Sequence, residues 1–407
     1  MHDDDDGAPA RPRTPAPSRE YIALVALLIS IGALGTDVML PALDVIGSEL
    51  GAPGANDAHY IVTAFFLGMA AGQLVAGPLS DSFGRKPVIQ AGYGLFVLGC
   101  LLSMLTDDWG VMLAARALQG LGAAAPRIVV VALVRDAYAG RAMARVMSIV
   151  MAAFITVPIV APAIGEGLIR IGGWRSTFLG LAALAMLVSV WFALRQPETL
   201  PPARRRPFRP GEVMRGAAEI LRSRTVLGYT VTTGFVFGLF IGYLGSAQQI
   251  YETTFGAGDL FAVYFAVAAA SIGAASLVNA ALVMRLGMRT PTWLALLTLT
   301  ALSLGFLLRL PGWDGVPPLA AFLAWQLCAF FCVGIVFGNL NALALEPLGR
   351  RAGLGAAVVG ALSTFMSLPL AAWIGAGFDG TVRPLVAGFA LLGAAACLAM
   401  ALTDRDR

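Results

Sequence analysis

The sequence predicts an all-α membrane protein in which twelve transmembrane helices form two six-helix bundles. Hydrophobic residues make up 58% of the 407 residues and charged residues only 13%, about half the charged fraction of a typical soluble domain. The mean hydropathy is +0.78. A helix that spans a membrane needs about 20 apolar residues, and the apolar region from Tyr21 to Leu402 is long enough for twelve such helices with short connections.

A long polar stretch divides the apolar segments into six and six. The predicted spans, with edges good to a few residues, cover 21–46, 59–79, 88–106, 109–134, 143–170, 176–194, 226–250, 259–284, 291–308, 318–345, 354–378 and 383–402. The predicted domains are a disordered tail (1–20), an N-terminal bundle (21–194), an arginine-rich linker (195–225), a C-terminal bundle (226–402) and a short tail (403–407).

The positions of the basic residues predict the orientation of the chain. If the N-terminus is cytoplasmic, all but six of the 28 lysines and arginines fall in cytoplasmic loops or tails. This bias predicts a multi-pass protein of the bacterial inner membrane with both termini in the cytoplasm. The six exceptions are Arg170, Arg175, Arg309 and Arg383 outside, and Arg116 and Arg127 within a span. The basic linker could also bind anionic lipid or a protein partner.

Composition argues against several other classes of protein. The four cysteines lie in apolar segments, where they are expected to pack rather than form disulfides, and the two histidines are too few for a histidine-based metal site. We therefore expect no metal and no cofactor. The net charge of +4 is explained by the orientation signals, so no nucleic-acid partner is expected. No nucleophile, base and metal constellation of an enzyme is visible.

The loop at 77–87 carries a distinctive pattern of glycines and charges. Glycines allow close approach of helices, an aspartate can pair with a cation or cap the next helix, and basic residues hold the loop in the cytosol. A weaker echo at 287–291, six spans later, supports two related halves. The residues of the first loop that carry the pattern are Gly77, Asp81, Gly84, Arg85 and Lys86.

This loop resembles the signature loop between the second and third helices of the major facilitator superfamily. In that family the cluster holds the two bundles together at the cytoplasmic face, although Ser82 stands where an arginine is common. The stretch 116–122 resembles the family's buried-arginine motif. That resemblance implies a role for Arg116 in proton coupling; alternatively, Arg116 extends to the outer membrane surface.

The stretch 35–43 is similar to an acidic pattern of drug/proton antiporters of the Bcr/CflA type. The similarity makes Asp37 the best candidate for the residue that takes up and releases a proton, because a carboxylate in a low-dielectric environment is sensitive to its neighbours. The alternative is a solvated acid near the outer mouth, or a cap at the helix kink before Pro41.

The fifth span resembles the proline- and glycine-rich antiporter motif, which bends and packs against the other bundle. The sequence departs from it at Ala161 and at Glu166, where the motif has glycine. Glu166 could be a second proton carrier, a counter-ion for the substrate, or an acid near the outer end facing Arg170. The matching positions are Pro158, Pro162, Gly165 and Gly167.

Several further residues are candidates for contact with a substrate. Arg127 lies eleven residues beyond Arg116 and thus on roughly the same helical face, where it could attract an anionic or carbonyl-rich substrate or reach the cytoplasmic surface near Arg135. Aromatic and polar residues in spans could line a binding cavity, although most such residues pack against lipid or other helices. The remaining candidates are Phe154, Tyr243, Gln248, Asn339 and Asn341.

The resemblance covers nearly the whole chain and implies the fold and the activity together. It implies a major facilitator fold that exports small organic molecules or drugs in exchange for protons, by rocking of the two bundles. It also implies a monomer whose partners are the substrate, protons and membrane lipids. The rival hypothesis is an importer or facilitator of a small, possibly anionic, metabolite with the same fold.

Overall fold

A computed structural model of the protein describes residues 18–138 and 140–405, which form helices and turns without any strand. Twelve helical segments in this part of the chain are long and apolar enough to cross a membrane, as the sequence predicts. The first half contains α1 (Arg19–Asp37), α2 (Leu43–Glu49), α3 (Tyr60–Phe83), α4 (Arg85–Leu105), α5 (Trp109–Ala137), α6 (Gly140–Gly172) and α7 (Arg175–Arg195).

The second half begins after the linker helix α8 (Pro210–Arg222). Its helices are α9 (Arg224–Gln249), α10 (Phe261–Leu286), α11 (Arg289–Arg309), α12 (Leu319–Leu345), α13 (Ala352–Ala376) and α14 (Arg383–Asp404). Of the predicted tails, 1–17 and 406–407 lie outside the described residues. Within the described part, Ser18 caps α1 by accepting a hydrogen bond from the amide of Tyr21 at 3.1 Å.

The first span, Arg19–Glu49, is interrupted about two thirds of the way along its length. Pro41 has no amide hydrogen, so it removes one hydrogen bond of a helix and favours a break there. The helix α1 ends at Asp37, a 3-10 turn covers Leu40–Ala42, and α2 continues the span. The break leaves Asp37 at the end of a helix inside the apolar part of the molecule.

Within the first half, α5 packs against α3 and α4 with their backbones in contact. A Cβ atom on Gly68 would overlap the carbonyl oxygen of Ala117, and one on Gly120 would overlap the carbonyl oxygen of Phe65. Small residues at both surfaces therefore let α3 and α5 approach closely, as is common between helices in membranes. In the second half, α9 packs mainly against α13 and α14.

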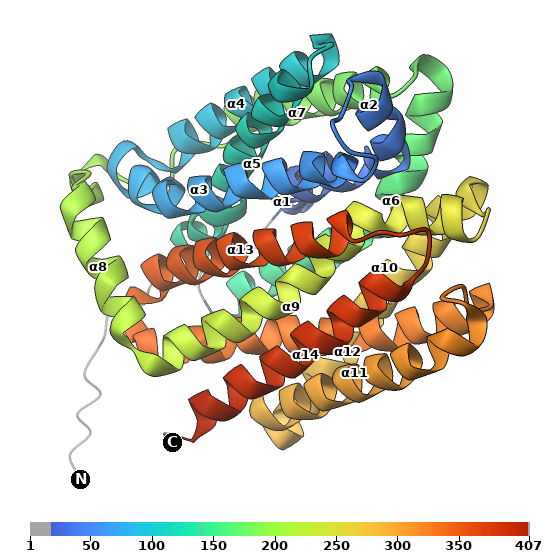
Figure 1. Ribbon diagram of the computed structural model, residues 1–407. Helices are drawn as coiled ribbons and strands as arrows, with labels where there is room; N and C mark the ends of the chain where they lie inside the picture. Colours follow the sequence, from blue (N-terminus) through green and yellow to red (C-terminus); the bar gives the residue numbers. More distant parts are fainter. Residues whose placement is uncertain (1–17, 139, 406–407) are drawn as a thin grey trace.

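Two helix pairs join the halves. Helix α3 packs against α13, which Figure 1 shows lying alongside it, and α6 packs against α10. Each half is therefore in contact with the other along two seams, one between α3 and α13 and one between α6 and α10.

The predicted linker contains a helix that the sequence analysis did not predict, α8 (Pro210–Arg222). Ile220 is buried, and Gly216 faces Leu354 of α13, because a Cβ there would come within 2.6 Å of the leucine Cδ2. Helix α8 lies at one end of the molecule and α2 at the other (Figure 1). We call the end that carries α8, Arg85 and Lys86 the basic face, and the opposite end the α2 face.

The contact between α3 and α5 gives a test of the packing. Replacing Gly120 by valine should lower the free energy of unfolding by about 1–3 kcal/mol, because the added side chain cannot fit against the α3 backbone. Thermal unfolding in detergent measures the change. The matched control is Gly94→Val on α4, where a Cβ meets no atom within 4 Å. Equal stability of the two variants would contradict the packing described.

Candidate functional site

Asp37 is a buried carboxylate without a protein partner. The residue is only 5% exposed, and its side chain makes no hydrogen bond or ion pair with any residue among 18–138 and 140–405. The 3-10 turn Leu40–Ala42, which begins three residues after Asp37, packs against α9 of the other half. Asp37 therefore lies at the end of α1, close to the second half of the molecule.

Arg116 is fully buried in α5 and binds backbone groups of two other helices. Its Nη1 donates to the carbonyl oxygen of Gly35 at 3.0 Å and to the side chain of Gln119, and its Nε donates to the carbonyl of Ile61 at 3.4 Å. The guanidinium also lies over the ring of Phe65, 4.7 Å from its centroid. These contacts do not fit the alternative that Arg116 extends to the membrane surface.

The structure places Arg116 and Asp37 near each other without pairing them. Arg116 binds the backbone of α1 two residues before Asp37, yet no ion pair joins the two side chains. Arg116 thus fixes the position of the α1 end that carries the carboxylate. Direct neutralisation of one by the other is not a feature of this conformation.

The proline- and glycine-rich helix α6 packs closely against the first span. A Cβ on Gly165 would overlap the carbonyl oxygen of Val38, so glycine is required there. Pro162 is buried within the helix. The close contact at Gly165 is thus with a neighbour in the same half, whereas the sequence motif led us to expect it against the other bundle; the contact between α6 and α10 is separate.

Glu166 links the two halves. Its Oε1 accepts a hydrogen bond of 3.2 Å from the amide of Ala262, in the first turn of α10. The free amides and the dipole at a helix N-terminus favour a carboxylate. Besides the three roles considered for Glu166, the structure indicates a fourth, which is to hold α6 and α10 together at the α2 face.

Gln248 also links the halves rather than standing free for a substrate. Its Nε2 donates to the carbonyl of Pro41 at 2.8 Å, and its Oε1 accepts from the amide of Asp44 at 3.3 Å. Nearby, Nδ2 of Asn56 donates to the carbonyls of Ala376 and Phe378 at 3.1 and 2.8 Å. These bonds hold the two halves together at the α2 face.

His59 fills a notch between two helices of the second half. The residue is 2% exposed, and a Cβ on Gly245 or Gly375 would come within 2.9 or 2.8 Å of its side chain. Its Nδ1 lies 2.7 Å from the carbonyl oxygen of Asn56. Sequence analysis missed this role, and the only available signal was a histidine at the entrance to an apolar span.

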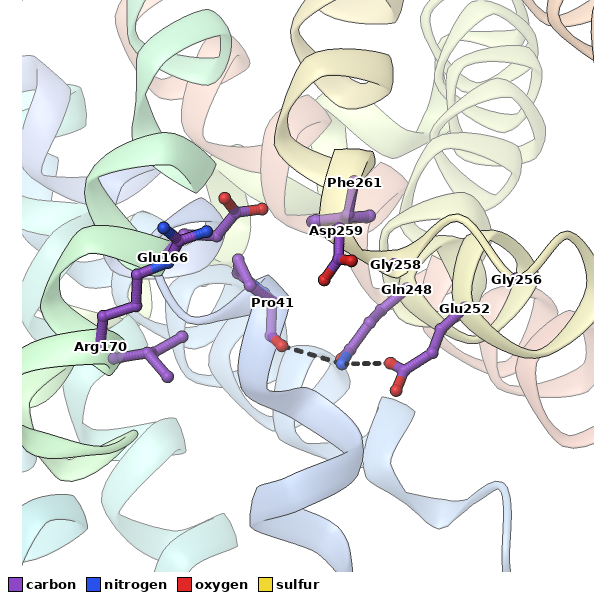
Figure 2. Close-up of a pocket in the computed structure, with 10 residues that line it drawn as sticks. Pro41, Glu166, Arg170, Gln248, Glu252, Gly256, Gly258, Asp259 and Phe261 are labelled. Carbon is purple, nitrogen blue, oxygen red and sulfur yellow. Dashed lines mark hydrogen bonds between the residues drawn. The ribbon is translucent and has the colours of Figure 1, made fainter.

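A cavity of about 410 Å³ lies between the halves at the α2 face (Figure 2). Its lining includes three carboxylates and one guanidinium, from Glu166, Glu252, Asp259 and Arg170. The excess of negative charge favours cations over anions at this mouth. No group of three or more histidine, cysteine or acidic side chains in the described residues could hold a metal ion.

At the basic face, the charged loop is organised around Arg85. Its guanidinium, which is almost fully buried, binds Asp81 at 2.5 Å and Asp136 at 2.9 Å. Glu198 accepts hydrogen bonds from the amides of Arg85 and Lys86 at 3.0 and 3.1 Å and so caps α4, a role that sequence analysis missed. Nζ of Lys86 donates to the carbonyl of Ala193.

This cluster joins parts of the first half and the linker. None of the bonds just described reaches the second half. The resemblance had led us to expect that this cluster holds the two bundles together. Gly84, with φ of 107°, needs to be glycine, and a Cβ there would meet the Glu198 carboxylate. Gly77 does not need to be, because a Cβ would make an ordinary contact at 3.8 Å.

The other candidates for substrate contact divide into partnered and available side chains. The Tyr243 hydroxyl accepts from Gln326 at 2.7 Å, and Asn339 exchanges two hydrogen bonds of 2.9 Å with Asn279. The remaining three candidates have no such partner. They are Phe154, half-buried on α6, Asn341, exposed on α12, and Arg127, exposed on α5.

The sequence profile of the Major Facilitator Superfamily matches residues 25–372 of this chain. The chain belongs to this superfamily. It is 29% identical over 356 residues to a "Bicyclomycin resistance protein homolog" of Haemophilus influenzae, covering 84% of this chain and 85% of that one. It is also 29% identical over 346 residues to the "Multidrug resistance protein MdtL" of Escherichia coli, with 84% and 85% covered. These relatives confirm the resemblance to the Bcr/CflA group.

Solved structures of superfamily members share the fold. A D-xylose-proton symporter superposes with a TM-score of 0.72 at 14% identity, covering 93% of this chain and 96% of that one. The human organic anion transporter MFSD10 gives a TM-score of 0.65 at 18% identity, with 94% and 99% covered. The predicted major facilitator fold is therefore confirmed. The protein is a major facilitator transporter, not an enzyme, and a multi-pass bacterial membrane protein.

The fit of His59 against α13 gives a test of closure at the α2 face. Replacing Gly375 by valine should push the halves apart there, because the new side chain occupies the space of the imidazole. Double electron–electron resonance between spin labels at Ser48 and Thr253, in a background without native cysteines, should show a longer mean distance.

Gly353→Val is the matched control on the same helix, since a Cβ at Gly353 meets nothing within 4 Å. An unchanged distance in the Gly375 variant would show that His59 does not hold this end closed.

Proposed function

We propose that this transporter exports small organic molecules or drugs in exchange for protons across the bacterial inner membrane. The observation that carries the proposal is the buried, unpartnered carboxylate of Asp37 at the break in the first span. The named functions of the relatives, bicyclomycin resistance and multidrug resistance, support export of organic compounds.

Asp37 is the group that binds and releases the proton. An ionisable side chain within a membrane protein is costly to keep charged without a partner, and either a proton or a bound substrate removes that cost. Proton binding and substrate binding then compete at one place. Arg116 positions the carboxylate through the Gly35 carbonyl and so couples α5 to the end of α1.

The contrast between the two ends of the molecule supports alternating access. The bonds of Glu166, Gln248 and Asn56 close the α2 face, whereas the Arg85 cluster bonds within its own half. The concentration of arginine at the basic face supports a cytoplasmic position for that face and for both termini. We infer a state closed to the outside, a monomeric transporter, and rocking of the halves about the two seams.

A second candidate is an importer or facilitator of a small anionic metabolite. The unpaired Arg127 favours it, because an exposed guanidinium in a span suits an anionic substrate. The direction of transport separates the two candidates, since both use the same fold.

Replacing Asp37 by asparagine should abolish proton-coupled transport while leaving the protein folded, because the amide is similar in shape but cannot carry a proton. Proteoliposomes loaded with a pH-sensitive dye measure proton movement when candidate drugs are added across an imposed gradient. Proton flux opposite to the drug, lost in the variant, is the expected result.

Asp107→Asn provides the matched control, because its side chain is exposed and pairs with Arg175 outside the apolar region. Retained pH-driven export in the Asp37 variant would refute the role of Asp37. Proton movement in the same direction as the substrate would support the importer instead.

A further inference from the structure

Arg127 lies within the apolar part of α5, eight residues before the next charged residue, Arg135. It is ten residues from Ala137, the last residue of α5, and therefore about 15 Å from that end at the helical rise of 1.5 Å per residue. The apolar core of a membrane is about 30 Å thick. A guanidinium at this depth needs either a protein partner or a water-filled space.

The protein supplies no acidic partner for this guanidinium. Among residues 18–138 and 140–405, its one polar contact is a 3.7 Å approach of Nη1 to the sulfur of Met69. The other arginine of α5 within the span, Arg116, binds two backbone carbonyls, and Arg85 binds two carboxylates. Arg127 thus keeps its hydrogen-bond donors for a group outside the described chain.

The contact with Met69 shows which way Arg127 points. Met69 is 2% exposed, on the buried side of α3, whereas Leu67 and Val75 form the exposed side of that helix. The Arg127 side chain is exposed, although its Nη1 contacts a residue on the buried side of α3. It therefore faces an internal space between helices rather than the lipid side of α3.

Aromatic rings lie one helical turn away. Phe66 precedes Met69 by three residues and so lies on the same side of α3. Its ring centroid is 5.5 Å from that of Phe237 on α9, which in turn lies 6.3 Å from Phe240 and 5.7 Å from Phe337 on α12. We call these four rings the aromatic cluster. The three rings from the second half are partly exposed and so available for contact.

We propose that the substrate is an aromatic organic anion, whose carboxylate or similar acidic group binds Arg127 and whose ring packs against the aromatic cluster. The planar guanidinium offers paired donors that match a carboxylate, and aromatic rings pack favourably edge to face. The two contacts come from different halves of the protein. This inference rests on the proposed transport function and specifies the substrate class.

The acidic cavity at the α2 face is not lined by Arg127 and is not the proposed anion site. Glu166, Glu252 and Asp259 repel an anion, so the mouth does not compete with Arg127 for it. Exchange of a monovalent anion for a proton also moves two charges per cycle. An inside-negative membrane potential would then drive export in addition to the pH gradient.

Equilibrium binding tests the assignment without any gradient. Isothermal titration calorimetry of the purified protein would compare 1-naphthoate with its uncharged methyl ester and with 1-naphthylmethylammonium. The wild type should bind the acid at least about tenfold more tightly than the ester, as a hydrogen-bonded charge pair requires. Arg127→Gln should lose this preference, and Arg127→Lys should keep part of it.

Arg135→Gln is the matched control, since Arg135 is exposed two turns further along α5 and should leave the preference unchanged. Melting temperatures of the variants separate loss of binding from loss of folding. Equal or absent binding of the acid to the wild type, or an unchanged preference in Arg127→Gln, would overturn the proposal. Displacement of 1-naphthoate by added phosphatidylglycerol would also overturn it, in favour of a lipid headgroup at Arg127.

The binding test and the proton-flux test fail independently. Binding of 1-naphthoate requires neither proton coupling nor a direction of transport, so a facilitator would still show it. Loss of proton coupling in Asp37→Asn, together with no preference for the acid, would leave the exporter standing with a different substrate class.

Discussion

The absence of water in the apolar layer constrains this structure more than any other factor. Polar groups there are stabilised by partners within the protein or by water, and Arg116 shows the first case through its Nη1 and Nε. Its guanidinium binds backbone carbonyls of α1 and α3 from its position on α5. One side chain thereby fixes three helices relative to one another, next to the break in the first span where Asp37 lies.

The same constraint explains how much of the fold could be predicted. Twelve long apolar segments are visible in the sequence because each must cross the layer alone as a helix. The helix α8 could not be predicted in this way, because it lies in a polar linker and its burial depends on contacts such as that of Gly216 with Leu354. A resemblance to known transporters supplied the arrangement of the halves, which hydropathy does not contain.

The candidate site was only partly predictable, for a related reason. A polar residue in a span indicates that a partner exists but not which one. Gln248 and Glu166 were recognised as unusual, yet their partners, Pro41 and Ala262, are backbone groups distant in sequence. Glu198 and His59 gave weaker signals still, since a charge after a span and a histidine before one are common at membrane surfaces. Arg127 was recognisable because a guanidinium in a span is rare, and its isolation became clear only from the structure.

The hydrogen bonds that close the α2 face depend on the side chains of only a few residues. Each hydrogen bond described between the halves there joins a side chain on one half to a main-chain group on the other, as with Glu166 and the amide of Ala262. A main-chain group is retained in almost any substitution, so the residues that supply it can change without weakening closure at the α2 face. Mutations that change the balance between open and closed states should therefore accumulate at Glu166, Gln248 and Asn56. A population adapting to a new toxic compound would alter closure of the α2 face through these few residues.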